Sequence, residues 1–254
     1  MFERLLHPHR ATLRKEPLTD EERAIVLRNV PHVAHLDSAD RAELDGLVRV
    51  FLAEKSFEGC GGLTLTDEIK VTIAAEACLL LLHRETDMYP NVDSIVVYPG
   101  AYRVPEGTHT IGGGVVVDGV EGRIGESWTR GLVVLAWDHV KPGVLHVHGQ
   151  SVVLHEFAHQ LDSEDGAMTG APELGTRARY ASWARVLGDE FTELSARVHA
   201  GRPSDIDAYG ATNAAEFFAV VTEMFFERPR AMKQRHPAMY AELVAFYAQD
   251  PAAQ

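Results

Sequence analysis

Residues 151–162 read Ser-Val-Val-Leu-His155-Glu156-Phe-Ala-His159-Gln-Leu-Asp and contain the pattern His-Glu-x-x-His directly after an apolar run. On an α-helix, residues four apart lie on one face, so the imidazoles of His155 and His159 can converge on one metal ion. Glu156 then projects beside them. Apolar residues cover most of the remaining circumference, so we expect a nearly buried helix, where polar side chains without partners are costly. The pattern therefore predicts a zinc site; the alternative is a core helix whose histidines are satisfied by ordinary hydrogen bonds.

The composition narrows the class of protein. With 254 residues, of which 46% are hydrophobic, the chain fits one large domain or two small ones. Its formal net charge of −13 argues against a nucleic-acid-binding surface, which needs clustered Lys and Arg. The two cysteines, Cys60 and Cys78, do not indicate a disulfide framework. The N-terminus lacks a signal-peptide core and no apolar run approaches ~20 residues, so we expect a soluble, cytoplasmic protein that does not bind membranes.

Helical patterns are expected in residues 1–85. Helices are predicted to begin near Thr19, Ser38 and Thr66, where capping residues precede acidic first turns or periodic apolar residues. The third of these helices is predicted to run through the apolar residues 79–82. Pro31 and the glycine-rich turn at residues 59–62 separate the three.

The pattern changes beyond residue 85. Short β-branched runs predict strands at residues 94–98, 115–117 and 131–137. Periodic apolar residues then predict helices at 151–162, 180–198, 213–226 and 237–248. A helical N-terminal part (1–85), followed by a small central sheet and further helices (86–254), predicts a single α+β domain over residues 1–254.

A zinc site that performs chemistry needs a third protein ligand, and two acidic residues are candidates. Asp165 lies six residues after His159, where some zinc peptidases place a ligand. That arrangement usually has Gly three residues after the second histidine, where this chain has Asp162, so we favour a turn at Asp165. Glu216, which opens a strongly apolar helix, is the second candidate.

The spacing leaves the role of Glu216 open. With Asn213 as the N-cap, Glu216 occupies the third helical position and could instead complete a capping box. Glu223, two turns later on the same face, suits either a partner for a ligand histidine or a salt bridge. His146 and His148 lie shortly before the predicted helix, and we expect them to be surface histidines rather than further ligands.

The motifs in combination resemble the Mlc titration factor A family of glucose-regulated bacterial zinc metallopeptidases. The similar segments are His155-Glu-Phe-Ala-His159-Gln-Leu-Asp, Tyr209 with Glu216-Phe-Phe-Ala, Lys55-Ser-Phe-Glu-Gly, residues 73–82 and Gly125-Glu-Ser-Trp128. They extend the resemblance over roughly residues 10 to 245. The seven-residue spacing from Tyr209 to Glu216 also resembles the catalytic domain of anthrax lethal factor.

This resemblance implies a zincin-like fold and a peptidase that acts in the aminopeptidase style on peptide or protein substrates. It implies one zinc ion per chain, and its site residues are His155, His159 and Glu216 as ligands, Glu156 as the general base and Tyr209 facing the scissile carbonyl. It also implies binding to a transcriptional repressor of the Mlc type. Val220 stands where several related peptidases carry an acidic residue that supports a ligand, so the identity of that supporting residue stays open.

Two functions are compatible with these expectations. In a zinc peptidase, Glu156 would take a proton from the attacking water, and Tyr209 would share the developing oxyanion with the metal. An extended substrate is then expected to pair with an exposed strand edge, that of residues 131–137. The alternative is a non-catalytic protein that titrates a repressor and keeps a structural metal site. The presence of Glu156 and Tyr209 favours the peptidase, because a structural site needs neither.

Overall fold

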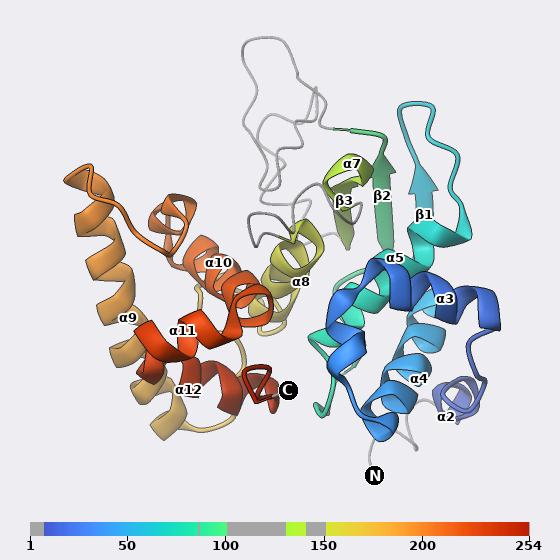
Figure 1. The fold of residues 1–254 in the computed structure, drawn as a ribbon, viewed down its shortest axis with the longest axis horizontal. Helices are drawn as coiled ribbons and strands as arrows, with labels where there is room; N and C mark the ends of the chain where they lie inside the picture. The colour runs from blue at the N-terminus through green and yellow to red at the C-terminus, as the bar shows by residue number, and fades with distance from the viewer. Residues whose placement is uncertain (1–7, 86, 101–130, 141–150, 254) are drawn as a thin grey trace. The chain divides into compact units, whose positions relative to one another are not determined.

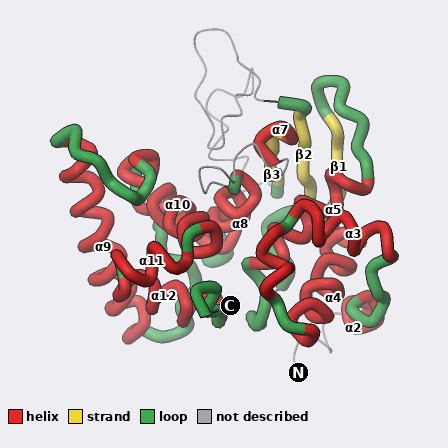
Figure 2. Tube along the Cα trace, in the orientation of Figure 1, coloured by secondary structure: helices red, strands yellow, loops and turns green. Residues whose placement is uncertain are grey.

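The computed structural model describes residues 8–85, 87–100, 131–140 and 151–253. The chain divides into two compact units, Met1–Leu145 and His146–Gln254 (Figure 1). Among the described residues, strands occur only in the first unit, and the second is built from helices and loops (Figure 2).

The first unit combines helices with a small sheet. Its elements are α2 (Pro8–Leu13), α3 (Asp20–Asn29), the 3₁₀ helix η1 (Pro31–His35), α4 (Ser38–Glu54), β1 (Ser56–Gly59), α5 (Asp67–Leu79), β2 (Ser94–Tyr98), β3 (Leu132–Ala136) and α7 (Trp137–Val140). The three predicted helix starts are confirmed: Thr19 and Glu22 form a capping box, and Asp37 and Thr66 cap α4 and α5. The α5 helix ends at Leu79 rather than continuing to residue 82, because the chain turns there.

The sheet has the order β1-β2-β3, and both strand pairs are parallel. Its register aligns Ser56 with Ser94 and Ser94 with Leu132. The predicted strand at 94–98 is confirmed. The predicted strand at 131–137 is confirmed as β3, except that Trp137 begins the short helix α7. The predicted strand at 115–117 lies outside the described residues. The sequence did not predict β1, because this strand has only four residues and none of them is buried.

The second unit is helical. Its elements are α8 (Val152–Asp162), α9 (Arg177–His199), the 3₁₀ helix η3 (Ala208–Ala211), α10 (Ala214–Glu227), α11 (Pro229–Arg235) and α12 (Pro237–Tyr247). Helices α8 and α10 lie side by side (Figure 1). Trp183 of α9, Phe218 of α10 and Phe246 of α12 form an aromatic cluster with ring centroids 5.7–5.8 Å apart. The four predicted helices are confirmed, whereas η3 and α11 were not predicted.

The chain is predominantly helical and carries one small sheet, so the predicted α+β class is confirmed. Within the described ranges, no helix has both the length and the apolar character that a membrane span requires. Whether residues 1–254 form one domain stays a prediction.

Candidate functional site

Helix α8 holds the two histidines of the His-Glu-x-x-His pattern on one face. The helix begins after Ser151, whose hydroxyl accepts the Leu154 N–H at 3.2 Å. Every residue of α8 is buried, as its nearly continuous apolar surface predicts. The rings of His155 and His159 lie edge to face with centroids 4.9 Å apart. The two imidazoles are therefore neighbours, as the spacing of four residues requires.

Helix α10 brings a carboxylate to the same place. Asn213 caps the helix by accepting the Glu216 N–H at 2.9 Å. The Glu216 carboxylate is directed to the histidines: its Oε2 lies 3.1 Å from Nε2 of His155 and 3.3 Å from Nε2 of His159. Of the two roles that the sequence left open, the capping role thus falls to Asn213, and the Glu216 side chain joins the histidine pair.

These three side chains could hold one metal ion. Their ligand atoms all lie within 4.8 Å of one another, and two imidazole nitrogens with one carboxylate oxygen are a donor set typical of catalytic zinc. Glu156 supports this interpretation. Both of its carboxylate oxygens are buried and have no hydrogen-bond partner among the described residues. Because an isolated buried carboxylate is costly, its position beside the three donors fits a site built for a cation and a polar reactant.

Glu223 contacts the other ring nitrogen of His155, the one that does not face Glu216. Its Oε1 lies 2.7 Å from Nδ1 of His155, and its Oε2 accepts the Ser151 N–H at 2.9 Å. This contact fixes the orientation of the imidazole and directs Nε2 toward Glu216. The spacing left two roles open for Glu223, and the structure shows the contact with a histidine. Glu223 therefore supplies the acidic support for which Val220, one turn earlier, has no suitable side chain.

The charges of the site are strongly coupled. Burial opposes a charge on His155, but the hydrogen bonds with Glu216 and Glu223 outweigh burial and raise the pKa of His155 to about 10. The same histidine contacts overcome burial at Glu216 and hold its pKa well below the usual range. Burial raises the pKa of Glu156 to about 8. A bound metal cation would replace the proton on His155, because metal and proton compete for the same imidazole lone pair.

Tyr209 lies next to His155 on the 3₁₀ helix η3. The Asp207 carboxylate accepts the Tyr209 N–H at 2.8 Å and orders this turn. The ring centroid of Tyr209 is 5.9 Å from that of His155, and the residue is 41% exposed. Burial of the hydroxyl and its interaction with Glu216 raise the pKa of Tyr209 to about 12. The hydroxyl therefore stays protonated at neutral pH and can donate a hydrogen bond.

The remaining candidates do not join this group. Asp165 is exposed, and its side chain accepts the Ala167 N–H at 3.1 Å, which confirms the predicted turn. His146 and His148 lie outside the described residues. Asp162 was considered only as a departure from a glycine pattern, yet it is fully buried and binds the loop that follows α8. The sequence signal that could have identified Asp162 was an acidic residue at the end of an otherwise apolar helix.

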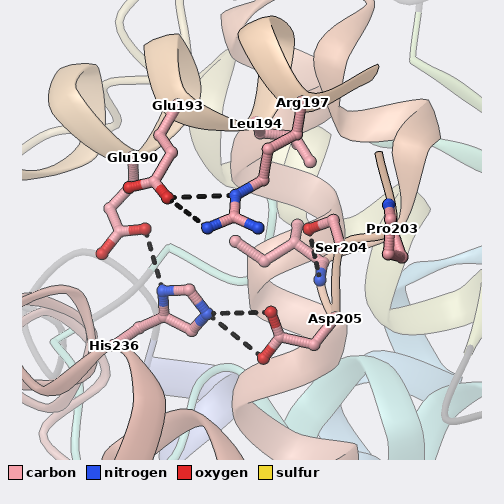
Figure 3. A pocket seen from close by; sticks show the side chains of 9 residues that line it. Glu190, Glu193, Leu194, Arg197, Pro203, Ser204, Asp205 and His236 are labelled. Carbon is pink, nitrogen blue, oxygen red and sulfur yellow. Dashed lines mark hydrogen bonds and ion pairs between the residues drawn. The ribbon is translucent and has the colours of Figure 1, made fainter. Parts of the chain in front are cut away.

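A second histidine in this unit also lies between two carboxylates. Nδ1 of His236 is 2.8 Å from Glu190, and its Nε2 is 3.3 Å from both oxygens of Asp205 (Figure 3). Both ring nitrogens are engaged with carboxylates, and the group does not converge with a second histidine on one point. These contacts indicate an ion-pair cluster rather than a metal site.

Comparisons with known proteins agree with the geometry. The family model of the glucose-regulated metallo-peptidase M90 matches residues 5–248 of this chain. An uncharacterized protein from Synechocystis sp. is 40% identical over 239 residues, which cover 93% of this chain and 86% of that protein. Mlc titration factor A from Serratia proteamaculans is 31% identical over 227 residues, which cover 88% of this chain and 86% of the relative. The protein of the same name from Klebsiella pneumoniae is also 31% identical over 227 residues, covering 88% and 84%.

The match extends over α8, η3 and α10, the elements that carry the site. The resemblance to the Mlc titration factor A family is confirmed, and with it membership of a metallopeptidase family of zincin-like fold. The resemblance of the Tyr-to-Glu spacing to anthrax lethal factor stays a prediction. The chain belongs to the glucose-regulated metallo-peptidase M90 family.

Proposed function

We propose that this protein is a zinc-dependent peptidase that binds one zinc ion through His155, His159 and Glu216. The observation that carries the proposal is the convergence of two Nε2 atoms on one Glu216 oxygen, 3.1 and 3.3 Å away. When bound, zinc supplies Lewis acidity and a water of lowered pKa.

Glu156 is proposed as the general base. Its two buried oxygens are free of hydrogen bonds to the described residues, so they can accept a proton from a water beside the histidines. Its pKa, which burial raises to about 8, is close to neutral pH, and such a group both accepts and returns a proton readily. Glu156 would take the proton during attack on the peptide carbonyl and deliver it to the leaving amine.

Tyr209 is proposed to stabilise the oxyanion. Its hydroxyl is protonated at neutral pH, because its pKa is raised to about 12. The residue is 41% exposed, so a substrate can reach it. A donor placed where negative charge develops strengthens most in the transition state. We further propose that the enzyme acts in the aminopeptidase style and works in the cytoplasm; the resemblance of its motifs supports the first and its sequence the second.

The first test replaces Glu156 by Gln. The amide has the same shape but cannot accept the proton, so kcat is expected to fall by about 10²- to 10⁴-fold. Zinc content and thermal unfolding should remain near wild type. Hydrolysis of a peptide library and metal analysis of the same preparation provide both measurements. Glu173→Gln, at an exposed glutamate of the same unit, is the matched control. Activity of Glu156→Gln within a few-fold of the control would exclude this base.

A second function is favoured by the relatives named Mlc titration factor A. We propose that the chain also binds a transcriptional repressor of the Mlc type, through a surface separate from the zinc site. The alternative is a non-catalytic protein that only titrates such a repressor.

Tyr209→Phe separates the two functions. Loss of one oxyanion donor is expected to lower kcat and kcat/KM together by about 10²- to 10³-fold, with little change in KM. Binding to an Mlc-type repressor, measured by calorimetry on the same preparation, should not change. Wild-type kinetics in this variant would remove the Tyr209 hydroxyl from the mechanism. Undetectable hydrolysis in the wild-type, zinc-loaded protein would favour the non-catalytic alternative.

A further inference from the structure

Asp162 is a buried carboxylate that the proposed mechanism does not use. It is the last residue of α8, three positions after His159, and its exposed fraction is 0%. Its Oδ2 accepts the Gly170 N–H at 2.7 Å, and its Oδ1 is buried with no hydrogen-bond partner among the described residues. One backbone amide of the following loop thus binds this side chain at the end of the histidine helix.

Folding stability alone does not explain this residue. Burial raises the pKa of Asp162 to about 6, and the hydrogen bond from Gly170 offsets burial only in part. A carboxyl group whose pKa is raised on folding lowers the free energy of unfolding at neutral pH, where it must ionise. The buried carboxylate therefore needs a role other than stabilising the fold, and its bond to Gly170 indicates that this role is to hold the loop in place.

Gly170 connects this loop to two further helices. Its carbonyl accepts the indole N–H of Trp183 on α9 at 2.9 Å. Its backbone has φ +75°, and a Cβ atom added there would lie 2.6 Å from the carbonyl carbon of Ala214. Contact that close requires glycine. The backbone of Gly170 is thus fixed by α8 and α9 and packs directly against the first residue of α10.

Glu216 lies only two residues beyond Ala214. Its carboxylate must reach the Nε2 atoms of both histidines from the first turn of α10, so a small shift of that turn changes both distances. Glu223 joins the two helices at the other end of the site, through its bonds to Ser151 and His155. Two connections therefore align α10 with α8, one on each side of the proposed ligands.

We propose that Asp162 is a positioning residue: through the backbone of Gly170 it sets where α10 begins and hence where the Glu216 carboxylate lies. This inference rests on the proposed function, because the consequence that it predicts is the affinity of the zinc site.

The test is a double-mutant cycle on zinc affinity, measured by competition with a chelator. Asp162→Ala is expected to weaken zinc binding by about 10- to 100-fold, the usual effect of residues that orient a ligand. In the Glu216→Ala background the same change should alter affinity by less than about threefold, because the residue through which it acts is gone. Equal losses in both backgrounds, or no loss in either, would overturn the proposal.

A matched control lies in the same loop. The carboxylate of Asp165 also accepts a backbone N–H, from Ala167, but the residue is exposed. Asp165→Ala is expected to keep wild-type zinc affinity, and a loss as large as that of Asp162→Ala would mean that loop order in general is responsible. Where Asp162→Ala does not fold, Asp162→Asn replaces it; the amide keeps one acceptor oxygen, so the expected loss is about 3- to 10-fold.

Crystal structures of the full chain give a readout that does not depend on zinc affinity. In Asp162→Ala, which cannot accept the Gly170 N–H, the Glu216 carboxylate should move away from the two histidines, while the contact of Glu223 with His155 is kept. An unmoved Glu216 overturns the positioning role. A wild-type protein that binds no zinc would instead defeat the proposed function, and the displacement of Glu216 would still decide the role of Asp162.

Discussion

His155 and His236 present the same motif in two parts of one helical unit: each imidazole lies between two carboxylates. His155 contacts Glu223 through Nδ1 and Glu216 through Nε2, and His236 contacts Glu190 and Asp205 in the same way. Both contacts raise the pKa of the histidine. The two histidines differ in the further contact that the second carboxylate makes. Glu216 also reaches Nε2 of His159, whereas Asp205 pairs with Arg235 at 3.1 Å.

This difference separates a site for a cation from a structural ion pair. At His236 the carboxylate charge is balanced by His236 and Arg235, both cations of the protein itself. At His155 the acidic side chains Glu156, Glu216 and Glu223 surround two imidazoles that are almost fully buried. An arrangement with excess carboxylate and converging imidazole nitrogens is suited to a divalent cation. A histidine between two carboxylates therefore does not by itself indicate a metal site. The feature that indicates one is a second imidazole that converges on the same carboxylate.

The largest expected difference is in zinc affinity. His155→Gln removes a proposed ligand while keeping a polar side chain. If each ligand supplies about a quarter to a third of a total near 10 kcal/mol, the loss is about 60- to 250-fold. His236→Gln should keep wild-type affinity within about threefold. Titration against a chelating dye measures both variants under one condition. Equal losses would mean that the His236 cluster also contributes to metal binding and is not a purely structural ion pair.

A smaller effect is expected from the carboxylates that orient each histidine. Glu223→Gln weakens the contact that directs His155, so zinc affinity should fall by about 10- to 100-fold. Glu190→Gln makes the corresponding change at His236 and should leave zinc affinity unaltered. Isothermal calorimetry at one pH compares the pair. Unchanged affinity in Glu223→Gln would show that packing of the buried ring, rather than this hydrogen bond, holds His155 in place.

The local parts of the site were predictable from the sequence. His155 and His159 face the same way because their relation depends only on the helical period, and apolar residues around them require burial. Asn213 was a recognisable N-cap for the same reason. Glu216 was ambiguous, since a glutamate three residues after an N-cap asparagine fits a capping box as well as a metal ligand. Only the packing of α10 against α8 distinguishes the two.

The non-local parts could not be predicted. Gly170 meets Ala214 across 44 residues, and no periodic pattern connects a loop glycine with the start of a helix. Asp162 appeared as a departure from a known pattern because its hydrogen-bond partner is a backbone amide, which leaves no mark in the sequence. The four residues of β1 alternate only between exposed and half-buried, and the strand is too short for such a pattern to identify it. For Gly170 and for β1 the deciding contact joins segments that are distant along the chain.

The smallest expected effect concerns pH and the stability of the second histidine cluster. The hydrogen bond with Glu190 raises the pKa of His236, Asp205 adds to the shift, and burial opposes it. The folded-state pKa therefore lies above the unfolded one, so the protonated imidazole stabilises the fold fully below about pH 6.5. This contribution is lost as the pH rises through the folded-state pKa. The Asp205 carboxyl stays ionised throughout, because Arg235 and His236 lower its pKa.

Urea unfolding of wild type and His236→Gln at pH 6 and pH 9 tests this sign. The difference in free energy of unfolding between the two proteins should be larger at pH 6, by about 1 kcal/mol or less, as expected for a partly exposed ion pair. Subtracting the variant from the wild type cancels the titration of groups away from the cluster. A difference that is equal at both pH values would mean that His236 stabilises α12 by packing alone. A difference that grows at pH 9 would mean that His236 is neutral in the fold, and the electrostatic likeness to His155 would then be lost.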